Sequence, residues 1–510
     1  MAAVAMTKPK TRLLLIMPPQ PGLLGGFATG LVSLANYVSR RAPSIDTEVL
    51  DLSASSLSDS REQVHASFSG GINDLVFVGI TTTTASYQSA LRVAEIAKGV
   101  APRCVVVFGG HHASADAEHV LRKHIGGVDI VIAGEGERSL AELLREYPNV
   151  ERVHGAVYLR DGSLVRNPSP GFLTQDELDS LPVTFEKHRL VGIPGKFDHV
   201  TYVSARGCPL RCSFCSVGDE RIRPKSIPAI LRDLNQLLEA GFRRIAIEDN
   251  FFAHSPARTR DLCLAIAEFR HTHNGAFTWD CQTRVESIAR SNTVRLLAKA
   301  GCEAVYIGVE SLHAEHLRYL GKTANPADYI EQLNQLVIPR LLDSPVECYL
   351  NLQFGLPGES QAHERRTIEI LADLGSKAAS KGRTITLFPQ LHVVYPGTRH
   401  FQDGLAQGLF PGDVFESFTA WEFEQAPVRF WLGEHFAHGT GGLPVGILNG
   451  PALKTGRYEV DADAILRISG TLKAISRLPG ITTFHFGNYL IKNNPPVAAQ
   501  RGVDGGAQPA

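Results

Sequence analysis

The feature that most constrains the fold of this chain is a regular alternation of short apolar runs with amphipathic helical segments. In the first third, the apolar runs occupy residues 12–17, 47–52, 74–80, 103–110 and 128–136. Continuous apolar strands separated by helices are typical of a parallel sheet with both faces covered. We therefore expect residues 10–150 to form a doubly wound parallel α/β domain, which binds its ligand at the carboxyl ends of the strands.

The alternation resumes near residue 198 and continues to about residue 400. Its apolar runs occupy residues 200–206, 243–250, 277–282, 304–310, 346–355 and 383–394. These six strand–helix units predict a partial (β/α)6 barrel over residues 198–400, with the chemistry at the carboxyl ends of its strands. We expect 151–197 to be a linker, 401–492 a small mixed or α-helical region that covers the substrate, and 493–510 a flexible tail.

The composition limits the classes of protein to which the chain can belong. With 510 residues it is too long for one ordinary core, so two or three domains are expected. Apolar residues make up 44% and charged residues 20%, and the net charge of -1 offers no global field for nucleic acid or an anionic membrane. No apolar run reaches the ~18 residues of a membrane span, and the N-terminus lacks the apolar stretch of a secretory signal. We expect a cytoplasmic protein that binds neither nucleic acid nor membranes.

Small and polar residues stand where the strands of the first domain end. They are Thr81, Thr82, Gly109, Gly110, His111, Gly134 and Glu135. The first strand is not followed by G-x-G-x-x-G, and there is no P-loop, which argues against a nicotinamide or nucleoside-triphosphate site. Glycine lets the backbone approach a large planar ligand closely. The residues alone therefore predict a cofactor-binding sheet, although a glycine pair is equally compatible with a tight turn.

Three cysteines follow the first strand of the expected barrel in a C-x3-C-x2-C spacing. Cys208, Cys212 and Cys215 could bind zinc, but a zinc site needs a fourth ligand and usually contains C-x2-C pairs. They could also bind an iron–sulfur cluster, which would leave one iron open to an external ligand. The other five cysteines lie singly in or beside apolar segments, as buried and inert thiols do.

The spacing of the three cysteines, with Phe214 before the third, resembles the signature of the radical S-adenosylmethionine superfamily. The resemblance implies a 4Fe–4S cluster on Cys208, Cys212 and Cys215, whose open iron takes the amino and carboxylate groups of S-adenosylmethionine. The segments "IEDNFF", "VYIGVES", "FGLPGES" and "VVYPGT" follow in the order of that family's strand-end motifs. By this resemblance, the residues that contact S-adenosylmethionine are Phe214, Glu248, Asp249, Gln282, Arg284, Glu310, Gly355 and Pro357.

The first domain resembles the cobalamin-binding domain attached to many radical S-adenosylmethionine enzymes. The resemblance rests on "GITTTTASY", "VVVFGGHHAS" and "VIAGEGERSL". It implies that cobalamin contacts the strand-end residues Thr81, Thr82, Gly109, Gly110, His111, Gly134 and Glu135. The loop "PPQPGLLGG" has no histidine, so the cofactor is expected with its own base displaced and without a cobalt ligand from that loop.

Together the two resemblances imply a class B radical S-adenosylmethionine methyltransferase. Such an enzyme methylates an unactivated carbon, or a phosphorus, of a small metabolite by means of a 5′-deoxyadenosyl radical and methylcobalamin. A non-methylating radical reaction (cyclisation, ring contraction or desaturation) is the alternative among enzymes. A cobalamin or metal sensor is the alternative outside them. The implied partners are a small-molecule substrate and an electron donor such as flavodoxin or ferredoxin.

Overall fold

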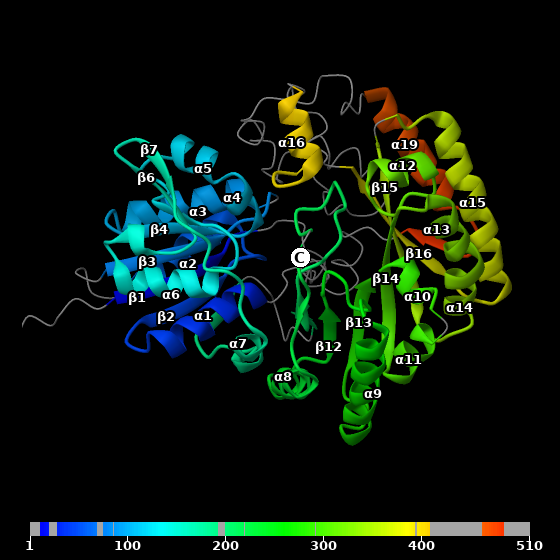
Figure 1. The fold of residues 1–510 in the computed structure, drawn as a ribbon, viewed down its shortest axis with the longest axis horizontal. Helices are drawn as coiled ribbons and strands as arrows, with labels where there is room; N and C mark the ends of the chain where they lie inside the picture. Colours follow the sequence, from blue (N-terminus) through cyan, green and yellow to red (C-terminus); the bar gives the residue numbers. More distant parts are fainter. Residues whose placement is uncertain are drawn as a thin grey trace, which may run out of the picture.

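Buried apolar strands form the centre of the first of two α/β units, which lie side by side in the computed structural model (Figure 1). The structure describes residues 11–19, 28–68, 75–84, 86–191, 199–218, 220–290, 292–356, 358–392, 395–407 and 462–483. The first unit contains an eight-stranded sheet in the order β7-β6-β5-β4-β3-β1-β2-β8. Its strands are β1 (Thr11–Met17), β2 (Asp46–Asp51), β3 (Leu75–Thr81), β4 (Val105–Gly109), β5 (Ile130–Ile132), β6 (Ala156–Arg160), β7 (Ser163–Arg166) and β8 (His188–Leu190).

Helices cover both faces of this sheet, because both faces of its central strands are apolar. The helices are α1 (Thr29–Arg41), α2 (Leu57–Ser67), α3 (Tyr87–Val100), α4 (His111–Ala115), α5 (Ala117–Lys123), α6 (Gly136–Glu146) and α7 (Gln175–Ser180). Leu13 and Leu15 of β1 pack in one core with residues of α1 and α6. Leu14 and Ile16 pack in a second core with residues of α3 and α5. The expected doubly wound architecture is confirmed.

The described part of the segment expected to be a linker (151–197), residues 151–191, instead extends this sheet. β6 and β7 form an antiparallel hairpin that pairs with β5, and β8 pairs parallel with β2. Asp161 and Gly162 between β6 and β7 have φ angles of 52° and 76°. Two successive positive φ angles are the geometry of a two-residue hairpin turn, for which Asp-Gly is a favoured pair. The sheet is therefore parallel at its centre and antiparallel at one edge.

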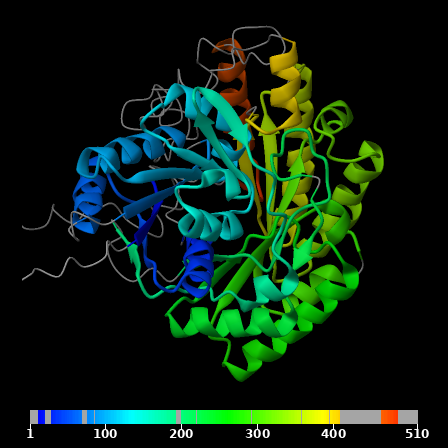
Figure 2. The ribbon, with the colours of Figure 1, turned by 60° about the vertical axis from the view of Figure 1, so that its left-hand side comes forward.

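The second unit is an open barrel of seven parallel strands in the order β17-β16-β15-β14-β13-β12-β9 (Figures 1 and 2). Its strands are β9 (His199–Tyr202), β12 (Arg244–Ile247), β13 (Thr278–Thr283), β14 (Cys302–Glu310), β15 (Glu347–Phe354), β16 (Ile385–Leu391) and β17 (Ile481–Thr483). A small antiparallel hairpin, β10 (Ala205–Arg206) and β11 (Arg223–Pro224), follows β9. The helices are α8 (Ile227–Glu239), α9 (Pro256–Thr272), α10 (Val285–Ile288), α11 (Thr293–Lys299), α12 (Ala314–Tyr319), α13 (Pro326–Gln332), α14 (Ile338–Leu342), α15 (Gln361–Ser380), α16 (Arg399–Ala406) and α19 (Ala462–Ile475).

The six expected barrel strands are all present, and the chain adds a seventh near its C-terminal end. β17 pairs parallel with β16, and α19 packs against α15. A Cβ atom on Gly480 would lie 2.1 Å from the carbonyl oxygen of Gly375 in α15, so only glycine allows this close approach. The rest of the expected covering region and the expected tail, residues 408–461 and 484–510, lie outside the described residues.

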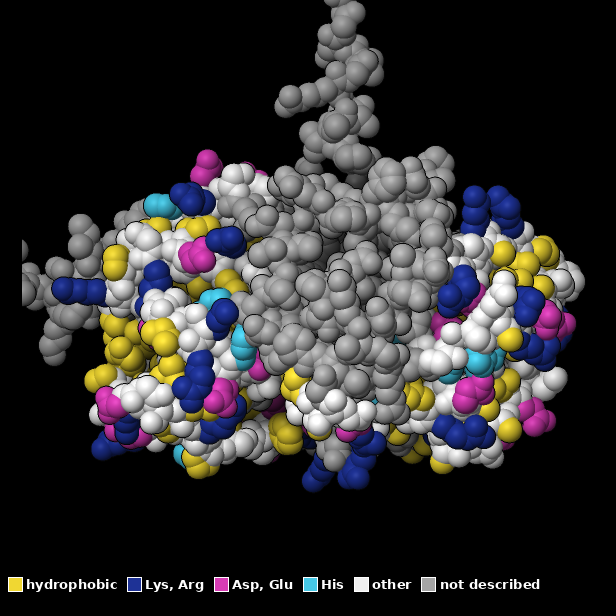
Figure 3. All heavy atoms as spheres, turned by 90° about the horizontal axis from the view of Figure 1, so that it is seen from above, with side chains coloured by type: hydrophobic (Ala, Val, Ile, Leu, Met, Phe, Trp, Pro, Cys, Tyr) yellow, Lys and Arg dark blue, Asp and Glu magenta, His cyan; other side chains and the backbone are white. Residues whose placement is uncertain are grey.

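The visible surface carries charges of both signs. On the face in Figure 3, Lys and Arg side chains lie among Asp, Glu and neutral side chains on both flanks. None of the described helices combines the length and the apolar character needed to cross a bilayer.

Candidate functional site

The three cysteines lie on the loop that follows β10, the cysteine loop. Hydrogen bonds to two helical segments hold this loop in place. Ser213 donates its backbone N–H to the Leu320 carbonyl (2.9 Å) and its hydroxyl to the Tyr319 carbonyl (2.8 Å). At the start of α16, the His400 N–H donates to the Ser213 carbonyl (3.1 Å). Cys208 is buried, Cys212 is half-buried and Cys215 is exposed, so the loop runs from the interior to the open side.

Two positive charges lie near the thiols. The Arg284 Nη1 atom is 3.8 Å from the Cys212 sulfur, and the Arg284 Nη2 atom donates to the Lys322 carbonyl. Burial raises the pKa of Cys208, and the charges of Arg284 and Lys322 oppose that rise. Iron ligation removes the thiol protons, and nearby cations stabilise the resulting negative charge.

The donor set fits a 4Fe–4S cluster with one open iron better than it fits a single metal ion. No group of three His, Cys, Asp or Glu side chains in the described ranges could hold one ion. A cubane binds each thiolate to a different iron, so its ligands need not converge on one point. Arg284 and Lys322, the cations beside the thiols, suit an anionic thiolate–iron group.

The two acidic residues after β12 lie in different surroundings. The Glu248 side chain is exposed and faces the cavity described below. Asp249 is 2% exposed and accepts hydrogen bonds from the Ser204 N–H (2.6 Å), the Ser204 hydroxyl (2.5 Å) and the Ala205 N–H (2.9 Å). These contacts make Asp249 a brace for the backbone that leads into the cysteine loop, whereas Glu248 is open to a ligand.

Replacing Asp249 by Ala is expected to destabilise the fold without directly removing a contact to S-adenosylmethionine. The change leaves the buried N–H groups of Ser204 and Ala205 without their acceptor, which costs about 1–3 kcal/mol for each group. Glu248→Ala is the matched control, and its free energy of unfolding should stay within about 0.5 kcal/mol of the wild type. Urea unfolding and S-adenosylmethionine binding check this. An Asp249→Ala protein of normal stability that fails to bind S-adenosylmethionine would contradict the brace.

Glu310, the last residue of β14, has a strained backbone and a hydrogen-bonded carboxylate. Its φ of 69° is rare for a residue other than glycine, and the β14–β15 register shifts between Gly308 and Glu310. Its carboxylate accepts from Lys322 Nζ (3.0 Å) and Gln353 Nε2 (2.8 Å). The Gln353 Oε1 atom lies 2.8 Å from His392 Nδ1 and is an acceptor only, so His392 donates from Nδ1. Backbone strain of this kind is typical of functional positions.

The remaining candidates for S-adenosylmethionine contacts are spread over the same rim of the barrel. Gln282 is half-buried near the end of β13, and Phe214 is half-buried in the cysteine loop. Gly355 follows β15 with φ 75°, and its N–H donates to the Glu359 carboxylate (2.5 Å). Pro357 lies outside the described residues. The sequence interpretation missed Lys322, although the "YLGKT" segment places it soon after the fourth barrel strand.

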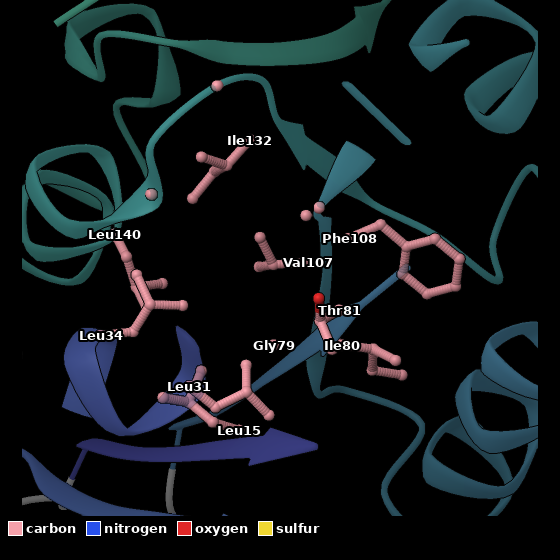
Figure 4. Close-up of a pocket in the computed structure, with 14 residues that line it drawn as sticks. Leu15, Leu31, Leu34, Gly79, Ile80, Thr81, Val107, Phe108, Ile132 and Leu140 are labelled. Carbon is pink, nitrogen blue, oxygen red and sulfur yellow. The ribbon is translucent and has the colours of Figure 1, made fainter. Parts of the chain in front are cut away.

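A narrow apolar slot opens between the first sheet and helices α1 and α6 (Figure 4). Its volume is about 450 Å³. Among the predicted cobalamin contacts, Thr81, Gly109, Gly110 and Gly134 line it. The sequence interpretation missed the apolar wall, which consists of Leu15, Leu31, Leu34, Ile80, Val107, Phe108, Ile132 and Leu140. In the sequence these residues have the pattern of ordinary core positions, because hydrophobic periodicity does not distinguish a core side chain from one that lines a slot.

An open cavity, larger than the slot, lies between the two units and is lined by residues of both. It shares Thr81, Gly110 and Gly134 with the slot, so the two spaces adjoin at the strand ends. A narrow apolar slot beside an open cavity suits a ligand with a flat body and a narrow tail.

The cavity brings one candidate contact of S-adenosylmethionine, Glu248, to the same space as several candidate contacts of cobalamin. His111 and Glu135 line it from the first unit, and Ser216 and Glu248 line it from the barrel. Burial lowers the pKa of His111 against the nearby charge of Glu220, which favours the neutral imidazole. Thr82 is fully buried, and its hydroxyl donates to the Gly109 carbonyl (2.8 Å), which makes it a support for the strand ends.

Two domain families match the chain in regions that agree with the two structural units. The B12 binding domain family matches residues 26–144, and the radical SAM superfamily matches residues 202–377. No helix that could cross a membrane was found in the described part of either region. The expected cofactors, namely cobalamin, S-adenosylmethionine and a 4Fe–4S cluster, are those of these two domains.

Known proteins resemble the chain over most of its length. An uncharacterized methyltransferase of Pyrococcus horikoshii is 26% identical over 417 residues, which covers 78% of this chain and 84% of that protein. The anaerobic magnesium-protoporphyrin IX monomethyl ester cyclase of Rubrivivax gelatinosus is 28% identical over 341 residues, which covers 64% of this chain and 59% of that protein.

A solved structure shares the arrangement of the fold. The radical S-adenosylmethionine methyltransferase TsrM from Kitasatospora setae, solved with cobalamin and a 4Fe–4S cluster, aligns with a TM-score of 0.62 at 18% identity, covering 78% of each chain. This likeness concerns the fold alone. The chain thus joins a B12-binding domain to a radical SAM domain and is homologous to the cobalamin-dependent radical SAM methyltransferase TokK of Streptomyces tokunonensis, which is 26% identical over 57% of this chain and 44% of that protein.

Proposed function

We propose that this protein is a cobalamin-dependent radical S-adenosylmethionine methyltransferase that acts on an unactivated carbon, or a phosphorus, of a small metabolite. One observation carries the proposal: the cavity between the two units adjoins the slot of the B12-binding domain and is also lined by Ser216 and Val217 of the cysteine loop. A reaction that combines cobalamin with a radical needs both groups to face one substrate. The methyltransferase from Pyrococcus horikoshii supports the same assignment.

The cofactors supply the reactive chemistry, namely an electron from the cluster, a radical and a methyl group from S-adenosylmethionine, and a methyl carrier in cobalamin. The chain supplies positions and surroundings. Cys208, Cys212 and Cys215 would hold the cluster, and Glu310 would accept hydrogen bonds from the S-adenosylmethionine hydroxyls. The neutral ring of His111 would contact the edge of cobalamin. Walls contributed by both units would exclude water from the reacting centre.

Replacing Gly109 by Leu is expected to weaken cobalamin binding without unfolding the domain. Gly109 lines the slot, and a Cβ atom there would have its nearest neighbour at 3.9 Å, so the fold accepts a side chain that fills the slot. Crowding a well-packed space costs about 1–3 kcal/mol, which raises the Kd about 5- to 150-fold. Gly99→Leu on α3, where a Cβ atom meets nothing within 4 Å, is the control. Equilibrium dialysis of cobalamin checks the prediction, which is contradicted if both variants bind equally.

The function is tested with anaerobically reconstituted protein, cobalamin, a low-potential reductant and S-adenosylmethionine. Mass spectrometry quantifies 5′-deoxyadenosine, the product of radical cleavage, and S-adenosylhomocysteine, the product of methyl donation. Both products are expected, even without substrate. A substrate search by methyl mass shift follows, with flavodoxin and ferredoxin compared as the proposed physiological reductants. Neither product from a protein with an intact cluster would overturn the enzymatic proposal.

A non-methylating radical reaction is the second candidate. The Rubrivivax gelatinosus relative is a cyclase, and it aligns with 64% of this chain. Formation of 5′-deoxyadenosine without S-adenosylhomocysteine would favour this candidate over methyl transfer.

A further inference from the structure

A partly buried charge cluster joins the two units beside the cavity. Arg206 of β10 reaches from the barrel unit into the B12-binding domain, where its Nη2 atom donates to Glu137 Oε1 (2.7 Å). Its Nη1 atom is 3.3 Å from Glu135 Oε1. Glu137 is 3% exposed, and its Oε1 atom also accepts from the Ser33 hydroxyl of α1 (2.7 Å). One side chain of the barrel unit thus contacts two helical segments of the other unit.

A second arginine strengthens the same junction. Arg223 of β11 pairs directly with Arg206 in the hairpin, and its Nη1 atom is 2.7 Å from Glu135 Oε1. Its guanidinium lies 4.1 Å from the centre of the Phe172 ring. Glu135 also accepts from the Leu173 N–H (3.1 Å). Glu135, which the sequence predicted to contact cobalamin, is therefore engaged at the junction between the units.

The cluster favours one closed arrangement of the two units. Burial opposes charge on Glu137, but Arg206 outweighs it and lowers the pKa of that carboxyl. The carboxylates in turn raise the pKa of Arg206. Removing one partner of a buried ion pair leaves an uncompensated charge and is strongly destabilising. Separation of the units would likewise break these contacts.

The cluster also connects the B12-binding domain to the cysteine loop. Arg206 lies two residues before Cys208, and Gly207 between them has a φ angle of 85°. A Cβ atom added to Gly207 would lie 2.5 Å from the Arg221 carbonyl oxygen. This crowded backbone leaves little freedom between Arg206 and Cys208. Arg206, Arg223, Glu135 and Glu137 all line the cavity between the units.

We propose that Arg206 is a positioning residue, which locks the B12-binding domain onto the backbone segment that carries Cys208. It thereby sets the separation between bound cobalamin and S-adenosylmethionine. The effect on the separation of the cofactors rests on the proposed function. The contact by which Arg206 holds the two units together, the lock, does not. A misplacement of about 1 Å can cost a reaction about 100-fold in rate.

The test compares Arg206→Met with Arg206→Lys and with the control Arg189→Met. Arg189 makes its ion pair with Glu48 inside the first unit, at 2.5 Å. Hydrogen exchange in α6 and in the β10–β11 hairpin reports the lock, and solution scattering reports the separation of the units. The ratio of S-adenosylhomocysteine to 5′-deoxyadenosine reports the separation of the cofactors. Iron and cobalamin contents are measured in every sample.

With Arg206→Met we expect faster exchange in both segments, a larger radius of gyration and a product ratio lower by about 100-fold, with both cofactors retained. Arg206→Lys keeps the charge and should recover part of the ratio, and Arg189→Met should match the wild type. Wild-type exchange and scattering in Arg206→Met would overturn the lock.

The lock remains testable if Arg206→Met does not fold or if the wild-type protein does not transfer a methyl group. If Arg206→Met does not fold, the double variant Arg206→Met with Glu137→Gln removes both charges of the pair and is measured in its place. The same faster exchange and lower ratio are expected of it, and wild-type values would overturn the lock. If wild-type protein forms no S-adenosylhomocysteine, the proposed methyl transfer has failed, and exchange and scattering alone decide the lock.

Discussion

Replacing Cys212 by Ala is expected to abolish the iron–sulfur cluster and, with it, all reductive cleavage of S-adenosylmethionine. The loop then offers two thiolates, which cannot hold a cubane with a single open iron. The iron content should fall from about four atoms per chain to near zero, and the visible absorbance of the reconstituted protein should disappear. The 5′-deoxyadenosine yield should fall to background.

The loss should come from the cluster rather than from unfolding. Cys212 is half-buried, so the free energy of unfolding of the apoprotein should change by only about 0.5 kcal/mol. Cys104→Ala is the control, because burial raises the pKa of Cys104 to about 11 and keeps it an inert thiol. Iron analysis and absorbance spectra of both variants check the assignment. Full iron content in Cys212→Ala would remove this residue from the proposed ligand set.

Replacing Glu310 by Ala is expected to weaken S-adenosylmethionine binding about 10- to 100-fold while the cluster remains. Lys322 and Gln353 each occupy one oxygen of the carboxylate. A carboxylate has about four acceptor sites, so acceptor capacity remains for hydroxyl groups of the ligand. A hydrogen bond to a charged group contributes about 1.5–3 kcal/mol, which corresponds to the expected loss of affinity.

The control for Glu310 lies on the same strand. Glu303 of β14 is exposed near the opposite end, so Glu303→Ala should bind S-adenosylmethionine normally. Isothermal titration of reconstituted protein gives the Kd values, and absorbance shows whether the cluster is retained. Equal affinity in Glu310→Ala and wild-type protein would exclude the proposed contact.

The sequence predicted most of the fold because its central strands are apolar on both faces. The run at residues 12–17 is the clearest case, since Leu13 to Ile16 each face one of two helical layers. The β6–β7 hairpin was missed because its strands are short and partly polar, and the Asp161–Gly162 turn was not recognised. β17 has three residues, too few for a periodic pattern.

The site was predicted less completely, because strand-end position does not determine the direction or the partner of a side chain. Glu248 and Asp249 are neighbours, yet only Glu248 opens to the cavity. Glu135 lies at a strand end of the first sheet, but its partners Arg206 and Arg223 come from the barrel unit. Such long-range ion pairs leave no local pattern in a single sequence.

The late position of β17 in the chain has a consequence for biosynthesis. A ribosome completes residues 199–407, including β16 and all three cysteines, before it reaches β17 at residue 481. Until then β16 lacks its partner strand β17, and the N–H and C=O groups that β17 pairs with could pair with another chain. The nascent protein therefore contains its cysteine loop, with all three thiols, before its barrel has its last strand.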